Sequence, residues 1–527
     1  MSTDRESDIV DDSEAPPEHE TEQAEDGAHP AGVYRIISIM GALALCALVP
    51  YVAPGLERFR AWQPGEELPF TGLFSFEMPV ARPAIGGGSG EVEAAARSDD
   101  DLLSAAPLPE AMAPHGGGGA SGDAGSTPAP RGAPAPRVPP AELQGLTREI
   151  ELPAGGELDF FFERLAAAAR REPGAVARIS MYAVSTNGAD RVSSTIRQGL
   201  QELFGDAGKG WIPISPGWTY QAHRDVQWAY QSWRTAVVNR GRGPDGRYGL
   251  GGVIASSAGP HSWASFGTMD DGPSNRAVSS FDIYYQSWPR GGEMVLEVDG
   301  AERERVNVHC GEDTRDLVHE VRVPRGPHEL TIRVDGNVRL YGVTMENDGP
   351  GVVVDALMLI GASVSAARNF DEEHIATQVR QREPDLLVFW LGGNDVISRF
   401  FTPERFRADY DDAIRRIRAG RPEASCLVVS VLDMGDLIDG RIRTRAYVEP
   451  VVRTQEQVAR DQGCAFFNLY AATGGRGTVE RWYNAGTRLM VADYVHLTDA
   501  GSRVVGTLIR RAILEAYDDW LEAGGHQ

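Results

Sequence analysis

The chain has 527 residues, and its 75 acidic and 51 basic side chains give a formal net charge of −24 at pH 7. The first thirty residues hold eleven of these acids and a single base, Arg5. Such a segment has too little apolar surface to fold, so we predict a disordered acidic tail over residues 1–33. The negative balance of the remaining chain argues against a nucleic-acid partner, because binding to phosphates requires a basic surface.

A long uncharged segment follows the tail. Ile36–Leu56 covers 21 residues without a charged side chain, which is enough for a helix to cross a bilayer. A cleaved signal peptide is the alternative, but the segment lacks both a strongly basic start and a good small-residue cleavage site. We therefore predict a single-pass anchor over residues 34–56. The large downstream domain is then expected on the periplasmic or extracytoplasmic side.

Residues 57–145 are rich in Gly, Pro and Ala, as in AIGGGSG and GSTPAPRGAPAPRVPP. This composition predicts a linker that is partly flexible and partly extended, and that tethers the downstream domain to the anchor.

The strand and helix patterns start near residue 146. FFFERLAAAARR predicts a helix, ARISMYAVS a buried strand, and VSSTIRQGLQELFG a helix closed by glycine. Residues 215–348 instead contain short alternating runs between turns, such as GEMVLEVDG and HELTIRVDG, which are typical of an all-β sandwich. From 349 to 525, apolar strands again alternate with amphipathic helices, as in DLLVFWLGGND and ADYDDAIRRIRAG. We predict an α/β fold with a doubly wound, mostly parallel sheet, built from residues 146–214 and 349–525, with the β-sandwich inserted between them.

The four cysteines do not have the spacing of a metal site. Cys46 lies in the predicted anchor and Cys310 in the predicted sandwich. Cys426 and Cys464 both lie in strand-like apolar runs, where buried free thiols are the favoured interpretation. A disulfide between these two residues remains open.

Polar or glycine residues follow three of the predicted parallel strands. Ser185 follows ISMYAV, Gly361 follows ALMLI, and Asn394 lies in the GGND segment after LLVFWL. Asp493 and His496, in VADYVHLTDAG, precede the last helix. Each residue alone has an ordinary structural explanation: a helix cap, a turn glycine or a surface histidine. Together they suggest one site, because ligands bind at the carboxyl ends of the strands in open α/β sheets.

These residue types fit nucleophilic catalysis. A serine hydroxyl becomes a nucleophile when a base accepts its proton, and His496 would be that base. Asp493 would orient the imidazole and stabilise its charged form. The backbone N–H groups of Ser185 and Gly361, together with the side-chain amide of Asn394, could donate hydrogen bonds to a developing oxyanion.

With these residues the chain resembles the SGNH (GDSL-like) hydrolase superfamily of serine esterases and acyltransferases. Ser185, Gly361 and Asn394 match the family's first three sequence blocks, and Asp493 with His496 matches the last one. The stretch Leu200–Trp211 is similar to a bacterial subgroup with an inserted carbohydrate-binding-like sandwich, which resembles peptidoglycan and polysaccharide O-acetylesterases. The resemblance implies a flavodoxin-like three-layer domain and no metal or other cofactor. The sequence departs from the family at Ala183 and Val184, where the family has Gly-Asp before the serine.

The tryptophans and tyrosines of the sandwich are candidates for glycan contacts, because sugar-binding modules stack aromatic rings on pyranose faces. Trp263, in a polar turn-like segment, is the strongest candidate for an exposed ring, followed by Trp288 and Tyr285. For any single tryptophan, packing in the sandwich core is the favoured interpretation.

Together with this resemblance to a bacterial subgroup, the sequence predicts a serine esterase that is anchored in a bacterial inner membrane. It would remove acyl groups, O-acetyl groups in particular, from a cell-envelope polysaccharide or peptidoglycan. Two alternatives remain open: an O-acyltransferase that uses the same residues, and a degenerate hydrolase that only binds glycans.

Overall fold

The computed structural model describes residues 97–112, 134–241 and 245–524, all within one compact unit, Ile85–Gln527. The predicted acidic tail and the predicted anchor lie outside the described residues. Within the described ranges, no helix is both long and apolar enough to span a membrane.

Five parallel strands form the central sheet: β1 (Val176–Ala183), β13 (Gly351–Met358), β14 (Leu386–Trp390), β15 (Ser425–Val429) and β18 (Ala465–Phe467). Their order across the sheet is β13-β1-β14-β15-β18. The second strand of the sheet in chain order therefore lies on one side of β1, and the later strands lie on the other. The direction in which successive strands are added reverses between β1 and β14. In folds of this kind, ligands bind at such a switch point, at the carboxyl ends of the strands.

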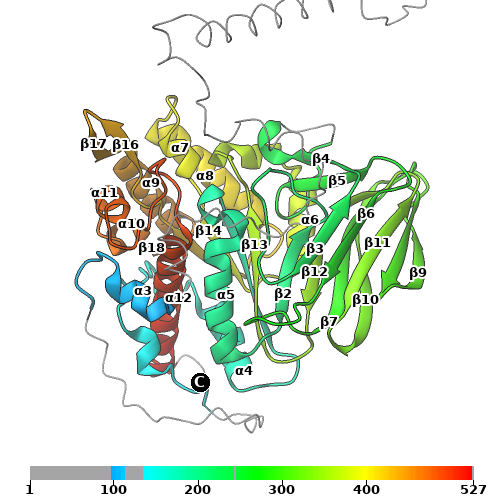
Figure 1. Ribbon diagram of the computed structural model, residues 1–527, viewed down its shortest axis with the longest axis horizontal. Coiled ribbons are helices and arrows are strands. Elements are labelled where there is room, and N and C mark those ends of the chain that lie inside the picture. Colours follow the sequence, from blue (N-terminus) through cyan, green and yellow to red (C-terminus); the bar gives the residue numbers. More distant parts are fainter. Residues whose placement is uncertain (1–96, 113–133, 242–244, 525–527) are drawn as a thin grey trace, which may run out of the picture. The chain divides into compact units, whose positions relative to one another are not determined.

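Helices cover both faces of this sheet (Figure 1). α4 (Asp159–Ala169), α5 (Arg191–Phe204) and α12 (Asp499–Glu522) pack their apolar side chains on one face. α6 (Glu372–Arg382), α8 (Pro403–Arg418) and α9 (Val448–Asp461) pack on the other face. Strands buried on both sides have to be apolar throughout, which explains the continuous runs from which the strands were predicted.

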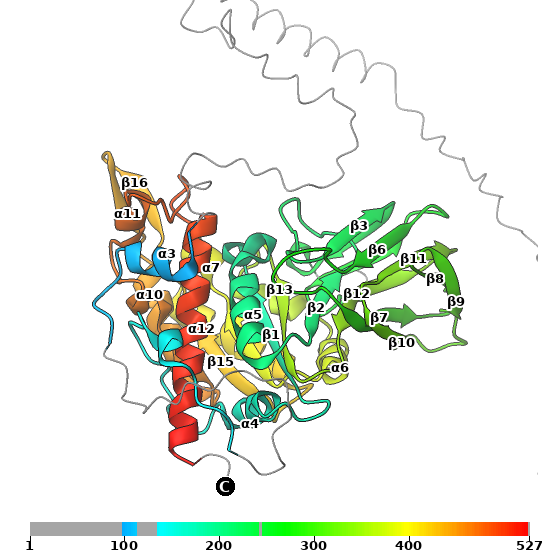
Figure 2. The ribbon, with the colours of Figure 1, turned by 60° about the horizontal axis from the view of Figure 1, so that its bottom comes forward.

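The segment between β1–α5 and β13 forms two antiparallel sheets next to the parallel sheet (Figure 2). One sheet has the order β10-β7-β12-β5-β4, with β2 also paired to β12, and the other has the order β3-β6-β11-β8-β9. Apolar side chains from both sheets share one buried core. The strands are β2 (Gly208–Pro213), β3 (Gln227–Gln231), β4 (Trp233–Val237), β5 (Val253–Ser257), β6 (Trp263–Gly267), β7 (Val278–Ser287), β8 (Glu293–Val298), β9 (Ala301–Asn307), β10 (Arg315–Gly326), β11 (Glu329–Asp335) and β12 (Arg339–Glu346).

A buried ion cluster joins these antiparallel sheets to the parallel sheet. Arg382 of α6 contacts Asp355 of β13, with Nε 2.8 Å from Oδ2, and also pairs with Glu346 at the end of β12. Arg178 of β1 places Nη2 2.8 Å from Glu346 Oε2. Although burial raises the pKa of Glu346, the charges of Arg382 and Arg178 outweigh it and lower the pKa to about 2. The carboxylate is therefore charged and locks strands of both sheets to α6.

Part of the predicted linker is folded, so the prediction of a linker over 57–145 is wrong for residues 97–112 and 134–145. α3 (Asp99–Ala105) begins with a capping box between Ser98 and Asp101, and it buries Leu102 and Leu103. In the second stretch, Val138 is buried and the 3₁₀ helix η3 (Pro140–Leu143) packs near α12. Two leucines and a cap are enough to fix a short helix on a neighbouring apolar surface, although the flanking composition resembles a linker.

Cys426 of β15 and Cys464, just before β18, form a disulfide with their Cα atoms 4.6 Å apart. The favoured interpretation of two free thiols is therefore wrong. The two strands are neighbours in the sheet, which brings the cysteines to matching positions. Cys310 is half-buried and free.

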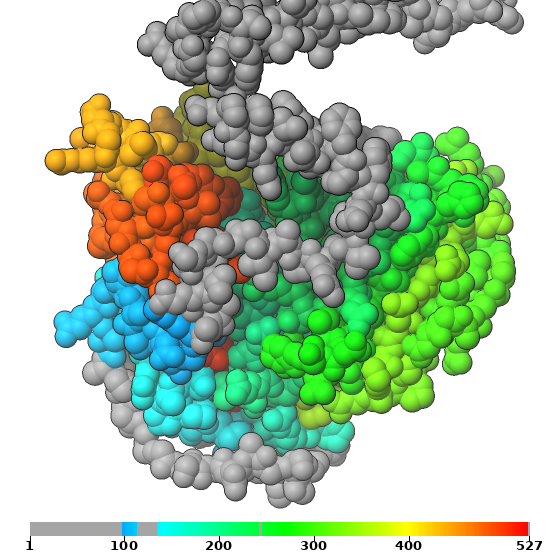
Figure 3. Space-filling view, viewed as in Figure 1, coloured from blue at the N-terminus to red at the C-terminus, as the bar shows by residue number. Residues whose placement is uncertain are grey.

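The remaining elements are short. They are η4 (Ser185–Asp190), η5 (Val238–Arg240), η6 (Val364–Asn369), α7 (Gly393–Val396), α10 (Leu469–Ala472), α11 (Thr478–Tyr483) and the hairpin β16 (Gly435–Ile438) with β17 (Arg441–Thr444). The β16–β17 hairpin projects at the upper left of the space-filling view in Figure 3, and its Leu437 side chain is 59% exposed.

Candidate active site

The loops after β1, β13 and β14 start at one edge of the parallel sheet. The last residue of β1 pairs with the last residue of β13 and with the last residue of β14. Ser185, Gly361 and Asn394 follow these three strand ends, so the sheet brings their loops together. The turns require glycine, because Gly361 and Gly392 adopt φ values of +73° and +101°.

A serine, a histidine and an aspartate form a continuous hydrogen-bonded chain at this edge. The Nε2 atom of His496 lies 2.9 Å from Ser185 Oγ, and its Nδ1 atom lies 2.5 Å from Asp493 Oδ2. The side chains of His496 and Asp493 are 40% and 46% exposed, and Ser185 is half-buried. The three groups are therefore aligned and open to solvent.

The short loop that carries Asp493 and His496 fixes both side chains. Asp493 Oδ1 accepts hydrogen bonds from the backbone N–H groups of Val495 and His496, both at 3.0 Å. Burial opposes a charge on Asp493, but the hydrogen bonds from the His496 ring and from these N–H groups outweigh it and lower the pKa of Asp493 well below its usual range. Asp493 is thus a carboxylate at any pH at which a histidine can act as a base.

Donors for an oxyanion lie on the same edge. Among the described residues, the backbone N–H groups of Ser185 and Gly361 donate to no acceptor, and Gly361 is exposed. The Asn394 side-chain amide donates one hydrogen bond to Ala362 O at 2.9 Å, which joins the loops after β13 and β14. An amide nitrogen carries two hydrogens, so the second remains for a ligand.

The segment before the serine is tightly packed. A Cβ atom on Gly393 would lie 3.3 Å from Val184 Cγ2 and 3.2 Å from Met434 Cε. After the serine, the buried Asn187 side chain accepts hydrogen bonds from the N–H groups of Val192 and Ser193 at the start of α5. Ala183, the last residue of β1, and Val184 therefore lead into a loop that is held from both sides.

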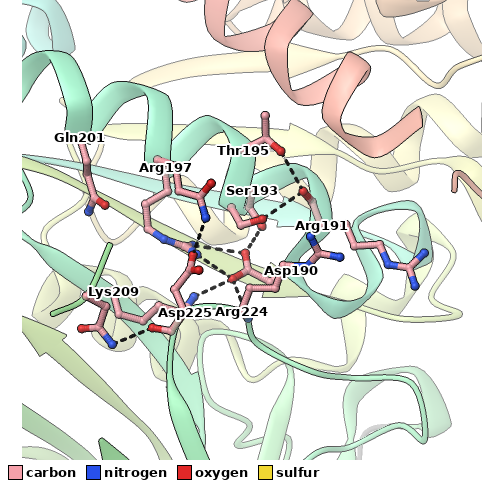
Figure 4. A network of polar contacts seen from close by, with 12 residues as sticks. Asp190, Arg191, Ser193, Thr195, Arg197, Gln201, Lys209, Arg224 and Asp225 are labelled. Atoms are coloured by element: carbon pink, nitrogen blue, oxygen red, sulfur yellow. Dashed lines mark hydrogen bonds and ion pairs between the residues drawn. The ribbon is translucent and has the colours of Figure 1, made fainter. Parts of the chain in front are cut away.

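A buried ionic network, which the sequence did not predict, closes the serine loop (Figure 4). Asp190 ends η4, and its carboxylate lies 3.0 Å from Arg197 Nη2 and 2.7 Å from Lys209 Nζ. Arg197 also contacts Asp225 at 2.7 Å, and the side chains of Asp190, Arg197 and Lys209 are fully buried. Burial alone would raise the pKa of Asp190, but the charges of Arg197 and Lys209 outweigh it and hold that pKa far below its usual range. One sequence signal was available: Lys209 is the only lysine in the chain.

A second contact joins the serine loop to the histidine loop. Asp499, three residues after His496, pairs with Arg191 Nε at 3.1 Å and with Arg224 Nη2 at 2.6 Å. Arg191 is the first residue of α5, and the backbone N–H of Arg224 donates to Asp190 at 3.2 Å. The segment between β2 and β3 thus contacts both loops of the site.

The three aromatic residues predicted to contact glycans have different environments. Tyr285 is 7% exposed and lies in the core between the antiparallel sheets, so the prediction of a surface ring is wrong there. Alternation along β7 places its ring on the inner face. Trp263 is half-buried rather than exposed, and its Nε1 donates to Gln231 Oε1 at 3.3 Å. Trp288 is half-buried beneath the guanidinium groups of Arg290 and Arg339.

No group of three or more His, Cys, Asp or Glu side chains within the described ranges is arranged to hold a metal ion.

Comparisons with known proteins give one family match and several structural similarities. Residues 336–504 match the model of the GDSL-like lipase/acylhydrolase family. Among solved structures, a peptidoglycan O-acetylesterase is similar with a TM-score of 0.58 and 20% identity, over 69% of this chain and 96% of that chain. At that level of identity, the similarity shows a shared fold.

Weaker similarities were also found. A Bacillus subtilis protein has a TM-score of 0.27 and 13% identity, over 60% of this chain and 98% of its own. A salicylyl-acyltransferase from a tetracycline biosynthetic pathway has a TM-score of 0.26 and 14% identity, over 57% of this chain and 96% of its own. The comparison with curated proteins found no match.

Proposed function

We propose that this protein is a membrane-anchored serine esterase that removes O-acetyl groups from a cell-envelope polysaccharide. The match of residues 336–504 to the GDSL-like lipase/acylhydrolase family supports an ester hydrolase. The single observation that carries this proposal is the 2.9 Å separation between Ser185 Oγ and His496 Nε2. A degenerate glycan-binding domain has no need for this alignment.

The proposed reaction has two halves. Ser185 Oγ attacks the ester carbonyl while His496 accepts its proton, and the oxyanion is held by the N–H groups of Ser185 and Gly361 and by the Asn394 amide. His496 then protonates the leaving sugar oxygen, which leaves an acetyl group on Ser185. In the second half, His496 removes a proton from water, the water attacks this ester, and acetate leaves as Ser185 regains its proton.

The substrate and the location are parts of the same proposal. A polysaccharide substrate is supported by the shared fold with a peptidoglycan O-acetylesterase. An extracytoplasmic location is supported by the Cys426–Cys464 disulfide, because disulfides persist in oxidising compartments. Residues 34–56 are proposed to hold the enzyme in the membrane.

The test measures acetate release by the full-length chain in detergent from 4-nitrophenyl acetate and from O-acetylated peptidoglycan. Ser185→Ala and His496→Ala should each lower kcat by at least about 10³-fold, because the removal of a nucleophile or its base disables the whole unit. Ser104→Ala and His261→Ala, two exposed positions, are the matched controls. Equal rates for wild type and the Ser185 variant would rule out the proposal. Acetyl transfer to an added oligosaccharide, in place of acetate release, would assign a transferase.

A further inference from the structure

A cavity of about 230 Å³ lies against the two loops that follow β13 and β14. Its wall comes from three places: Ser363 and Ser365 after Gly361, the segment 395–402 after Asn394, and the first turns of α8. None of the roles described above uses this cavity.

The cavity and the candidate active site share the same two loops. Asn394 donates to Ala362 O at 2.9 Å, and the next residue, Asp395, accepts a hydrogen bond from Val364 N–H at 3.0 Å. Asp395 lines the cavity. Asn394, the proposed oxyanion donor, and Asp395, a residue of the cavity wall, are therefore consecutive in the chain. Hydrogen bonds join both of them to the loop after β13.

The wall combines hydroxyl groups, carboxyl groups and aromatic rings. Ser363 Oγ and Ser365 Oγ lie 3.2 Å apart, and Asp395 is buried beside them. Phe400 is 68% exposed, and Phe401 is partly buried next to it. Hydroxyl and carboxyl groups exchange hydrogen bonds with sugar hydroxyls. The Arg399 guanidinium carbon lies 4.9 Å from the centre of the Phe400 ring, and the rest of this exposed ring can pack on the apolar side of a pyranose.

The charged groups in the wall are partly paired with one another. Asp409 is held by Arg368 and lies 3.8 Å from Arg405 Nε, so one carboxylate is shared by two arginines. Burial raises the pKa of Asp395 to about 7, although the Val364 N–H opposes this shift. Near neutral pH its carboxyl group can therefore either donate or accept a hydrogen bond.

The volume limits the size of the ligand. At about 30 Å³ for each water molecule in the liquid, the cavity corresponds to about eight waters. This is room for one sugar ring.

We propose that this cavity is a subsite for one pyranose unit of the acetylated glycan, which it positions so that the ester of a neighbouring unit reaches Ser185. The inference rests on the proposed esterase function and adds the place where the polymer is recognised. It does not assign any bond-making step to the cavity.

The test compares two substrates, 4-nitrophenyl acetate and O-acetylated peptidoglycan, on the full-length enzyme. Phe400→Ala removes the exposed ring, and Ser365→Trp fills the cavity. Each change should lower the ratio of kcat/KM for the glycan to kcat/KM for the small ester by about fivefold to tenfold, mainly through a higher KM for the glycan. Tyr220→Ala removes a ring that is 82% exposed elsewhere on the chain, and this control should leave the ratio unchanged.

A second readout uses inhibition. Deacetylated peptidoglycan fragments should inhibit small-ester hydrolysis by wild type, and their inhibition constant should rise by about the same factor in both cavity variants. If wild type cleaves both substrates but the variants keep the ratio and the inhibition constant, the subsite is ruled out and the esterase function stands. If wild type and Ser185→Ala are equally inactive on both substrates, the esterase function itself fails.

Discussion

Asn394 and Asp395 are neighbours in sequence with opposite electrostatic requirements. Asn394 is neutral, half-buried and bonded to a carbonyl. Asp395 is 9% exposed, and burial, reinforced by the charge of Asp409, raises its pKa to about 7 in spite of the Val364 N–H bond. When Asp395 ionises, the loop therefore carries a poorly solvated negative charge. This charge lies close to the position where an oxyanion would form in the proposed reaction.

This burial makes stability depend on pH. The pKa of Asp395 is about 7 in the folded chain and about 3.9 in the unfolded chain, so the folded state binds more protons between these values. The free energy of unfolding should then fall as pH rises from about 4 to about 7, by up to about 4 kcal/mol from this residue. Asp395→Asn should remove that decrease and be more stable than wild type above pH 7. Urea unfolding at several pH values measures the difference.

The control for this prediction is Asp436→Asn, at a side chain that is 51% exposed. It should keep the wild-type dependence between pH 4 and pH 7. An Asp395 variant with the same slope as wild type would show that the carboxyl group is not desolvated.

At the residue level, the sequence predicted which groups would meet but not what holds them. Ser185, Gly361 and Asn394 were found because parallel strands end at one edge, and His496 was found because its segment precedes the last helix. The partners of Asp190 lie 7 and 19 residues away along the chain, and Asp225 lies on a different segment again. A spacing of seven residues is two turns of α5, which places Arg197 near Asp190. No local period links Asp190 to Lys209 or to Asp225, so only the tertiary structure brings those residues together.

At the level of elements, η4, α5 and β2 form one unit around the Asp190 network. Two acids, Asp190 and Asp225, balance two bases, Arg197 and Lys209, so the cluster is close to neutral. Lysine occurs only here in a chain that otherwise uses arginine. A compact ammonium group fits a carboxylate in a narrow space where a planar guanidinium does not.

Breaking this network should be costly. Asp190→Asn leaves two buried cations with one carboxylate between them, and should lower the free energy of unfolding by about 3–5 kcal/mol. Lys209→Arg, which keeps the charge, should also destabilise the chain, because it adds bulk to a fully packed site. Chemical denaturation measures both effects.

The matched comparison is a surface ion pair. Arg445 and Asp436 are 21% and 51% exposed, so Asp436→Asn should change the free energy of unfolding by less than about 1 kcal/mol. Equal losses for Asp190→Asn and Asp436→Asn would contradict the assignment of the buried network as an anchor of the serine loop.

The disulfide acts between two other elements, β15 and β18. Cys426 and Cys464 close a loop of 38 residues, for which a chain-entropy model gives about 4 kcal/mol of stabilisation. The double variant Cys426→Ser, Cys464→Ser should lower the free energy of unfolding by that order, whereas Cys310→Ser should have little effect. Unfolding in the presence and absence of dithiothreitol provides the measurement. Insensitivity of wild type to the reductant would indicate that the bond does not form.

Elements with a clear apolar or amphipathic pattern could be predicted from the sequence, and elements without one could not. The five parallel strands are continuous apolar runs, even where a strand is short, and the six helices on the two faces of the sheet are amphipathic runs. α3 is seven residues long and lies in a segment of linker composition, and the β16–β17 hairpin has exposed apolar residues. For such short segments, packing against α12 or a neighbouring loop determines the structure more than local preference does.

At the level of the whole described unit, the antiparallel and parallel sheets share buried groups. One apolar core contains Trp211, Tyr284 and Tyr341 from the antiparallel sheet together with Tyr182 and Leu357 from the parallel sheet. The cluster of Arg382, Asp355 and Glu346 crosses the same boundary. The insertion is therefore a structural part of the hydrolase domain and not an appended module.

A single cooperative unfolding transition should follow from this shared core. Differential scanning calorimetry of the full chain should give one main peak, and Glu346→Gln should shift it to lower temperature without splitting it. Glu302→Gln, in an ion pair that is 51% exposed on both sides, is the control and should leave the peak in place. Two separate peaks in wild type would contradict the shared core.

The position of β1 has a consequence for the timing of activity. β1 lies between β13 and β14, so both of its neighbours are synthesised long after it, and Ser185 meets His496 across a separation of 311 residues. Contacts this distant in sequence form late and slowly. A chain still on the ribosome therefore lacks the contact between Ser185 and His496, and the proposed ester hydrolysis can begin only after the His496 segment has been made and has packed against Ser185.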